Sequence, residues 1–210
     1  MTPPAKYISE HQVQGVNSSS QIIPRWEWRH FSSDYKSLKI YFSRFDQPVV
    51  QLSDEIYFLI HNPEINIKLR HNLIDIKKRL SVDANGLEKW TPLLKIEFPV
   101  NTTKMQEFFK LSELVYTDSV AGNDVNTFVK GISQINEVVV VNISKRRYKY
   151  YVMGVAAELT KIKAKQVEFA TIALEHEDAD LIKQAKIELG ININSNENYP
   201  AALKRYRSLT

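Results

Sequence analysis

Pairs of basic residues two positions apart recur along the sequence, and this spacing suits the binding of an anion. The pairs are Lys68 with Arg70, Lys77 with Arg79, and Lys145 with Arg147. In a β-strand, residues at i and i+2 point to the same side, so both cations of a pair share one face. Arginine offers a planar fork of N–H donors and lysine a compact point charge, and both bind phosphate oxygens well.

Acidic residues follow the same two-residue spacing. They are Glu27, which stands between two arginines, Glu158, which follows an apolar stretch, and Glu175 with Glu177. If the apolar faces of these strands pack beneath helices, the charged faces converge on one interior. Such an interior makes sense if it holds water, a metal ion and a polyanion, because unpaired buried charge is costly.

A simpler interpretation accounts for each pair taken singly. One basic pair on a strand most often belongs to a solvated sheet face. Asp75 could also neutralise Lys77 or Arg79 across the strand. Composition alone leaves the solvated face and the shared interior both open.

Alternating hydrophobicity predicts about eight strands that would carry these charges. We expect strands over residues 25–31, 54–61, two within 65–82 joined near His71 and Asn72, 90–100, 137–152, 151–164 and 166–178. We expect a helix from Ser33 or Asp34 through Phe42, one over 101–114 with Thr102 or Thr103 as N-cap, and one from Asn123 or Asp124 through Ile135. Two more helices should follow, one over 179–189 that ends before Gly190 and one that begins near Pro200. Antiparallel strands in this number usually close into a barrel or fold into a sandwich.

Composition narrows the classes of protein further. The 210 residues are 43% hydrophobic and 25% charged and contain no cysteine, as in an ordinary globular protein that needs no disulfide. No apolar run approaches the roughly 18 residues of a membrane span, and the start of the chain lacks the apolar region of a signal peptide, so we expect a cytoplasmic protein without a membrane partner. We expect residues 1–22 to form a flexible tail and residues 23–210 a single domain. The net charge of +4 allows an anionic partner but does not favour a long nucleic acid.

Several common catalytic motifs are absent from the sequence. It contains no G-x-x-x-x-G-K-[ST], no G-x-G-x-x-G and no G-x-S-x-G, and no two histidines have metal-ligand spacing. Without cysteine, thiol catalysis is excluded. The aromatic residues predict core or interface packing rather than a platform for stacking bases; they are Trp26, Trp28, Tyr148, Tyr150 and Tyr151.

Taken in order, these motifs resemble the CYTH superfamily, the triphosphate tunnel metalloenzymes. The resemblance covers residues 25 to 207 and rests on "RWEWR", "KLR", "KKR", "SKRRYKYY", "AEL", "ALEHE" and "NYPAAL". It implies an α+β fold, mainly an antiparallel eight-stranded β-barrel with flanking and C-terminal helices, whose polar tunnel binds triphosphate.

The resemblance also implies roles for individual residues. The residues that would bind phosphate oxygens are Arg25, Lys68, Arg70, Lys77, Arg79, Lys145 and Arg147. Those that would bind a Mg²⁺ or Mn²⁺ ion are Glu158, Glu175 and Glu177. Glu27 and Arg29 would be catalytic. The family's opening strand reads E-x-E-x-K, whereas here it is Arg25-Trp26-Glu27-Trp28-Arg29. The replaced first acid removes a metal contact and adds positive charge, which favours binding of a polyanion.

The function expected from this resemblance is metal-dependent phosphohydrolysis of a small triphosphate-bearing molecule. The substrate would be inorganic triphosphate, a nucleoside triphosphate or thiamine triphosphate, and no strand specifies its organic part. Because Arg25 replaces an acid, the alternative is a non-catalytic module that binds or senses a polyphosphate or nucleotide. The sequence leaves a homo-oligomer open.

Overall fold

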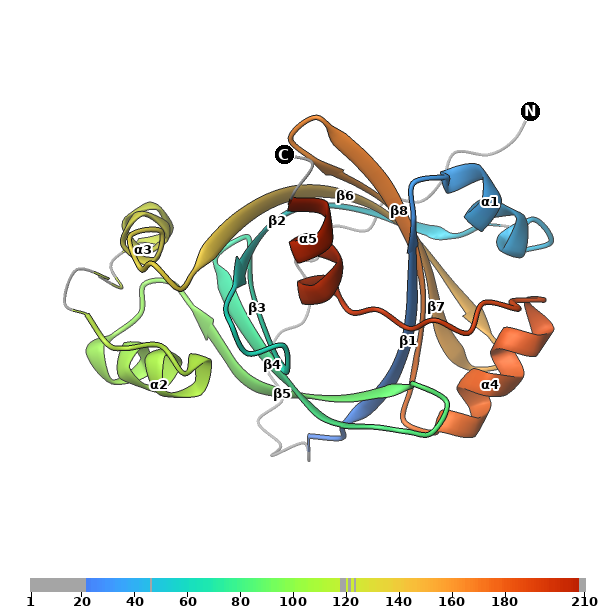
Figure 1. Ribbon diagram of the computed structural model, residues 1–210, viewed down its shortest axis with the longest axis horizontal. Coiled ribbons are helices and arrows are strands. Elements are labelled where there is room, and N and C mark those ends of the chain that lie inside the picture. The colour runs from blue at the N-terminus through green and yellow to red at the C-terminus, as the bar shows by residue number, and fades with distance from the viewer. Residues whose placement is uncertain (1–21, 46, 118–119, 121, 123, 208–210) are drawn as a thin grey trace.

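The computed structural model describes residues 22–207 apart from 46, 118–119, 121 and 123. Eight strands form one closed barrel in the order β1-β5-β4-β3-β2-β6-β7-β8, and β8 pairs with β1 to close it (Figure 1). Each pair of neighbouring strands is antiparallel. The predicted α+β fold with an eight-stranded antiparallel barrel is confirmed.

The elements follow one another along the chain as follows. The strands are β1 (Arg25–Ser32), β2 (Val49–Leu59), β3 (Ile65–Arg70), β4 (Leu73–Val82), β5 (Glu88–Glu97), β6 (Val139–Val152), β7 (Val155–Ala164) and β8 (Val167–His176). The helices are α1 (Tyr35–Lys39), the 3₁₀ turn η1 (Ile40–Phe42), α2 (Thr102–Ser112), α3 (Val125–Ile132), α4 (Ala179–Glu188) and α5 (Tyr199–Arg207).

Helices cover the outward-facing apolar side chains on two sides of the barrel. Phe108 of α2 and Phe128 of α3 are fully buried in a core that also contains Ile74 and Ile76 of β4. On another side, Ile182 of α4 is buried in a second core. Burying one such side chain contributes about 1.5–3 kcal/mol, so the apolar outer face of each strand fixes which face points inward.

The C-terminal helix α5 lies inside the ring of strands and closes one end of the barrel (Figure 1). Leu203 and Tyr206 of α5 pack against inward-facing side chains, including Phe31 of β1 and Phe169 of β8. The ring of Tyr206 stacks on that of Phe169 at 4.2 Å between centroids. The barrel interior therefore has an apolar end, which α5 fills, and a charged end.

The segment before α5 fills a gap between the strands β1 and β5. The register of β1 with β5 covers only Arg25, Trp26 and Glu27 on β1. Beyond it, the Asn196 side chain accepts a hydrogen bond from the Arg29 amide at 2.7 Å and donates to the Gly86 carbonyl at 2.7 Å. The Glu197 amide donates to the Arg29 carbonyl at 2.9 Å. This segment thereby satisfies backbone groups that the short strand pairing leaves open.

Most predicted elements are present, but several bounds differ. The second strand begins at Val49 rather than at 54, since the segment from Val49 to Ser53 pairs with β6. The N-cap of α2 is Asn101, whose side chain accepts from the Lys104 amide at 2.9 Å, so the prediction of Thr102 or Thr103 was wrong. Asp34 and Asp124 are the caps of α1 and α3. Position 123 and nearly all of the predicted tail lie outside the described residues.

No helix among the described residues is both long enough and apolar enough to cross a lipid bilayer.

Candidate functional site

A cavity of about 220 Å³ lies inside the charged part of the barrel. All eight strands and the start of α5 contribute to its wall. The lining side chains are Glu27, Arg29, Gln51, Tyr57, Asn66, Lys68, Arg70, Lys77, Trp90, Lys145, Arg147, Lys149, Glu158, Glu175, Asn198 and Tyr199. Residues from separate strands therefore share one enclosed interior, as the alternating charges indicate.

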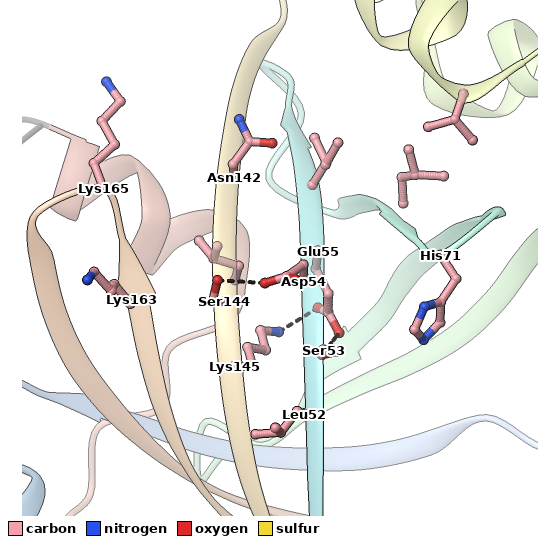
Figure 2. A pocket seen from close by; sticks show the side chains of 14 residues that line it. Leu52, Ser53, Asp54, Glu55, His71, Asn142, Ser144, Lys145, Lys163 and Lys165 are labelled. Atoms are coloured by element: carbon pink, nitrogen blue, oxygen red, sulfur yellow. Dashed lines mark hydrogen bonds and ion pairs between the residues drawn. The ribbon is translucent and has the colours of Figure 1, made fainter. Parts of the chain in front are cut away.

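The most deeply buried charges form a triad of two cations and one carboxylate. Lys145 Nζ lies 2.7 Å from Glu55 Oε2, and the Arg147 guanidinium donates to the other oxygen of the same carboxylate. Figure 2 shows the Lys145 and Glu55 side chains meeting between β6 and β2. Burial raises the pKa of Glu55, but the positive charges of Lys145 and Arg147 outweigh it and lower that pKa strongly. Burial lowers the pKa of Lys145 well below its usual value; the charge of Arg147 acts in the same direction, and the Glu55 carboxylate acts against it.

Tyr199, the first residue of α5, forms the floor of the cavity. Lys145 Nζ lies 3.6 Å from the centroid of its ring, and the Arg29 guanidinium lies 4.6 Å from it. The ring also stacks on Tyr57 at 5.2 Å between centroids. Burial raises the pKa of the Tyr199 hydroxyl, so this group stays protonated and is a hydrogen-bond donor at neutral pH.

Glu27 and Arg29 lie side by side on β1 and both point into the cavity. Arg29 Nε donates to Glu27 Oε1 at 2.9 Å. Burial raises the pKa of Glu27, but Arg29 and Lys77 more than offset this effect, so that the net shift is downward. Glu27 is therefore ionised at neutral pH, with an oxygen able to accept a hydrogen bond.

Two further cations of the predicted pairs have carboxylate partners. Lys68 Nζ lies 3.0 Å from Asp75 Oδ2, directly across the β3–β4 ladder. Arg79 Nη1 donates to Glu88 Oε1 at 2.6 Å. Asp75 thus pairs with Lys68, rather than with Lys77 or Arg79, because the register brings Lys68 opposite to it.

Three lining cations have no such partner. Arg70, Lys77 and Lys149 make no ion pair with a carboxylate among the described residues. They project from β3, β4 and β6 into the same cavity. The cavity therefore carries positive charge that the protein itself leaves without a carboxylate within ion-pair distance.

The carboxylates predicted to bind metal are only partly brought together. Glu158 and Glu175 line the cavity together with Glu27. Glu158 Oε2 lies 3.5 Å from Arg147 Nε, and Glu175 Oε1 lies 3.4 Å from Arg25 Nη1. Glu177 is exposed, follows the end of β8 and is not part of the lining. Across residues 22–207, apart from the gaps named above, no group of three His, Cys, Asp or Glu side chains is arranged to hold a metal ion.

The remaining predicted residues lie near the cavity. Arg25 stands at its exposed end, with a side chain 53% exposed, and Arg79 lies beside the lining residue Trp90, its register neighbour. The roles predicted for all of these residues stay predictions.

Glu55, Lys149, Asn198 and Tyr199 are among the site residues that were missed. Glu55 and Tyr57 alternate with the apolar Ile56 and Phe58, so the sequence indicated that they share a face. Asn198 and Tyr199 reach the cavity through contacts distant in sequence, which no local pattern indicates.

A larger hollow, of about 910 Å³, lies along β2 and β6 (Figure 2). Its polar groups include Ser144, whose hydroxyl donates to Asp54 Oδ1 at 2.6 Å, and the nearby lysines are Lys163 and Lys165. The buried pair of Glu55 and Lys145 also lines this hollow.

No family model and no curated protein matches this sequence. Among solved structures, the chain is similar to a protein from Hippeastrum, HpAC1, described as an adenylyl cyclase with a dominant triphosphatase activity. The two sequences are 14% identical, the match covers 86% of this chain and 95% of that chain, and the TM-score is 0.44. A protein from Bacillus halodurans described as an adenylate cyclase is 12% identical, over 88% and 96% of the two chains, with a TM-score of 0.46. A conserved hypothetical protein from Pyrococcus furiosus is 18% identical, over 84% and 98%, with a TM-score of 0.46.

Proposed function

We propose that the charged cavity of about 220 Å³ inside the barrel, the tunnel, binds the phosphate chain of a small triphosphate-bearing molecule, and that the protein hydrolyses its terminal phosphate. The observation that carries this proposal is the convergence of Arg70, Lys77 and Lys149 on one enclosed cavity without carboxylate partners among the described residues. Holding like charges together in a confined space is costly unless an anion compensates them. A polyphosphate supplies several negative charges within the length of one short chain.

Buried donors without acceptors support the same proposal. Within the described structure, Arg29 Nη1 and the Tyr199 hydroxyl are buried and have no hydrogen-bond partner, and Arg29 Nη1 has only a distant ion pair with Glu158, at 4.0 Å. An unsatisfied buried donor costs about 1–3 kcal/mol. Both groups border the cavity, where phosphate oxygens would accept from them.

The shape of the site favours a short anion with one free end. The interior closes at Tyr199 and α5, whereas Lys149 and Arg25 at the other end are exposed. A ligand therefore enters from the Arg25 end. The closed floor favours an end-on phosphate chain over a strand that passes through the barrel.

The residues of the chain have distinct tasks in the reaction. Arginine and lysine groups neutralise and align the phosphate oxygens, which is most of what phosphoryl transfer requires. Glu27 is ionised and accepts a hydrogen bond from the attacking water, which orients that water toward the terminal phosphorus. Arg29 holds Glu27 in place through its 2.9 Å hydrogen bond.

The carboxylates suit a divalent ion that is shared with the substrate. Mg²⁺ is usually held by one or two carboxylates together with phosphate oxygens and water, rather than by a complete protein cage. Glu27, Glu158 and Glu175 offer hard oxygen ligands in the same cavity, so one or two of them together with substrate oxygens would suit Mg²⁺ or Mn²⁺. When bound, the ion would polarise the terminal phosphate.

The direct test uses the full-length protein with inorganic triphosphate, ATP and thiamine triphosphate in the presence of Mg²⁺ or Mn²⁺. We expect calorimetric binding of triphosphate and release of phosphate. Glu27→Gln should still bind triphosphate but release phosphate roughly 100-fold more slowly, the scale of a lost acid–base contact. The absence of triphosphate binding would overturn the proposal.

A second candidate function is triphosphate binding without turnover. The ion pair of Arg25 with Glu175 favours it, because a cation occupies the place where the family has an acid and engages a neighbouring carboxylate. Binding without phosphate release under every metal condition would support this candidate. In that case, Arg25→Glu would be expected to introduce metal-dependent binding.

A further inference from the structure

A second hollow opens beside the tunnel at its exposed end. It measures about 740 Å³ and shares the lining residues Arg29, Lys149, Glu158 and Glu175 with the tunnel cavity. Because these walls are shared, the hollow adjoins the tunnel cavity directly. The volume lies within the range of about 300–1,000 Å³ that small-molecule sites occupy.

An open aromatic ring stands in this hollow. Tyr151, near the end of β6, lines this hollow and is 79% exposed. Its partner across the β6–β7 ladder is Ala156, and Ala173 of β8 also lines the hollow. In the described part of the chain, no other ring stacks on Tyr151. The prediction of core or interface packing holds for Trp26, Trp28, Tyr148 and Tyr150, but Tyr151 lies outside the cores of the described residues.

The apolar surface around this ring is exposed as well. Val49, at the start of β2, is 45% exposed and lines the same hollow. Positively charged groups border this apolar surface, among them Arg25 and Lys149. A ligand group that fits here has a planar apolar face and lies next to negative charge, which is the chemistry of a nucleobase attached to phosphates.

The hollow on the other side of Arg25 is less suited to such a group. It measures about 340 Å³ and its aromatic residue is Trp90. Trp90 is only 6% exposed, and its Nε1 already donates to Glu88 at 3.0 Å. Its ring is therefore not free to stack on a ligand.

We infer that the hollow beside Tyr151 receives the base of a nucleoside triphosphate, which stacks on the Tyr151 ring while the phosphates occupy the tunnel. This inference rests on the proposed function of the tunnel and assigns its substrate class. Stacking on an aromatic side chain recognises any base through its π-face, so the site selects a nucleotide over inorganic triphosphate without selecting one base strongly.

The test compares ATP with inorganic triphosphate on the full-length protein by calorimetry, with Mg²⁺ present. We expect Tyr151→Ala to weaken ATP binding roughly 5- to 150-fold, from the range measured for base–aromatic stacking, and to leave triphosphate binding within about 2-fold. Tyr151→Phe keeps the ring and should keep ATP binding. Ile187→Ala, which truncates an equally exposed residue on α4, is the matched control and should change neither ligand.

The outcomes separate this inference from the function on which it rests. If triphosphate binds but Tyr151→Ala leaves ATP unchanged, or weakens ATP and triphosphate equally, the base site is wrong and the tunnel function stands. If Tyr151→Phe loses as much ATP affinity as Tyr151→Ala, ring stacking is wrong. If neither ligand binds to the unmodified protein, the tunnel function itself is wrong.

Discussion

Lys145 and Glu55 form an ion pair of 2.7 Å between neighbouring strands, with side chains only 2% and 1% exposed. Arg147 binds the same carboxylate, so Glu55 balances one of two buried cations. The pair lies next to Tyr199, which forms the floor of the cavity. Glu158 lies 3.5 Å from Arg147, so Glu55 and Glu158 together balance the two buried cations.

Replacing Glu55 by Gln should destabilise the fold severely. The change leaves Lys145 buried without a carboxylate partner and Arg147 with Glu158 alone, and breaking a buried ion pair from one side costs about 3–5 kcal/mol. Urea unfolding followed by circular dichroism measures the loss. The double variant Glu55→Gln with Lys145→Met removes one stranded charge and should recover part of the stability. A loss below about 1 kcal/mol in the single variant would contradict this role of Glu55.

The free energy of unfolding should fall in acid below about pH 4.5, which is the unperturbed pKa of a glutamate side chain. The pKa of Glu27 and that of Glu55 are both lowered in the folded state, because neighbouring cations outweigh the effect of burial. A carboxyl group whose pKa is lower in the folded state contributes stability above the unfolded pKa. That contribution disappears as the pH falls toward the folded pKa.

Urea midpoints measured from pH 7 to pH 3 test this dependence. Glu27→Gln should show a shallower loss of stability in acid than the unmodified protein. Glu137→Gln, which changes an exposed residue outside the barrel strands, should show the full loss. An identical acid slope in Glu27→Gln and in the unmodified protein would refute the assignment.

Lys77→Met should weaken triphosphate binding without destabilising the fold. Lys77 makes no ion pair with a carboxylate among the described residues, and Glu27, whose pKa it helps to lower, keeps the hydrogen bond from Arg29. Hydrogen bonds to charged groups contribute about 1.5–3 kcal/mol, which corresponds to a loss of roughly 10- to 150-fold in affinity. Calorimetry measures the affinity, and Lys110→Met on the exposed face of α2 is the control for net charge. Equal affinity in both variants would remove Lys77 from the site.

The barrel and the charged interior were largely predictable because both depend on a local pattern. Residues such as Lys68 and Arg70 alternate with Ile67 and Leu69, and burial of the apolar residues beneath helices forces the charges inward. The missed carboxylate Glu55 follows the same alternation, because it stands between the exposed Asp54 and the apolar Ile56 on β2.

The pairing of charges was not predictable, because it depends on strand register and on contacts distant in sequence. The sequence does not specify that Asp75 stands opposite Lys68. Nor does any local pattern place α5 inside the barrel, where Tyr199 meets Lys145 and Arg29. The floor of the site therefore becomes visible only in three dimensions.

Tyr199→Phe separates the ligand-binding role of the floor from its structural role. The Tyr199 hydroxyl is buried without a hydrogen-bond partner in the described structure, so its removal breaks no protein contact, and the ring keeps its stacking on Tyr57. We expect unchanged or slightly higher stability in urea, since a desolvated polar group is removed. We expect triphosphate affinity to fall roughly 10- to 150-fold, because a hydrogen bond to a charged group contributes about 1.5–3 kcal/mol. Tyr206→Phe, deeper in the apolar end, serves as the control and should leave the affinity unchanged. Unchanged affinity in Tyr199→Phe would show that the ligand does not reach the floor, whereas lost stability would show that the hydroxyl has a structural partner.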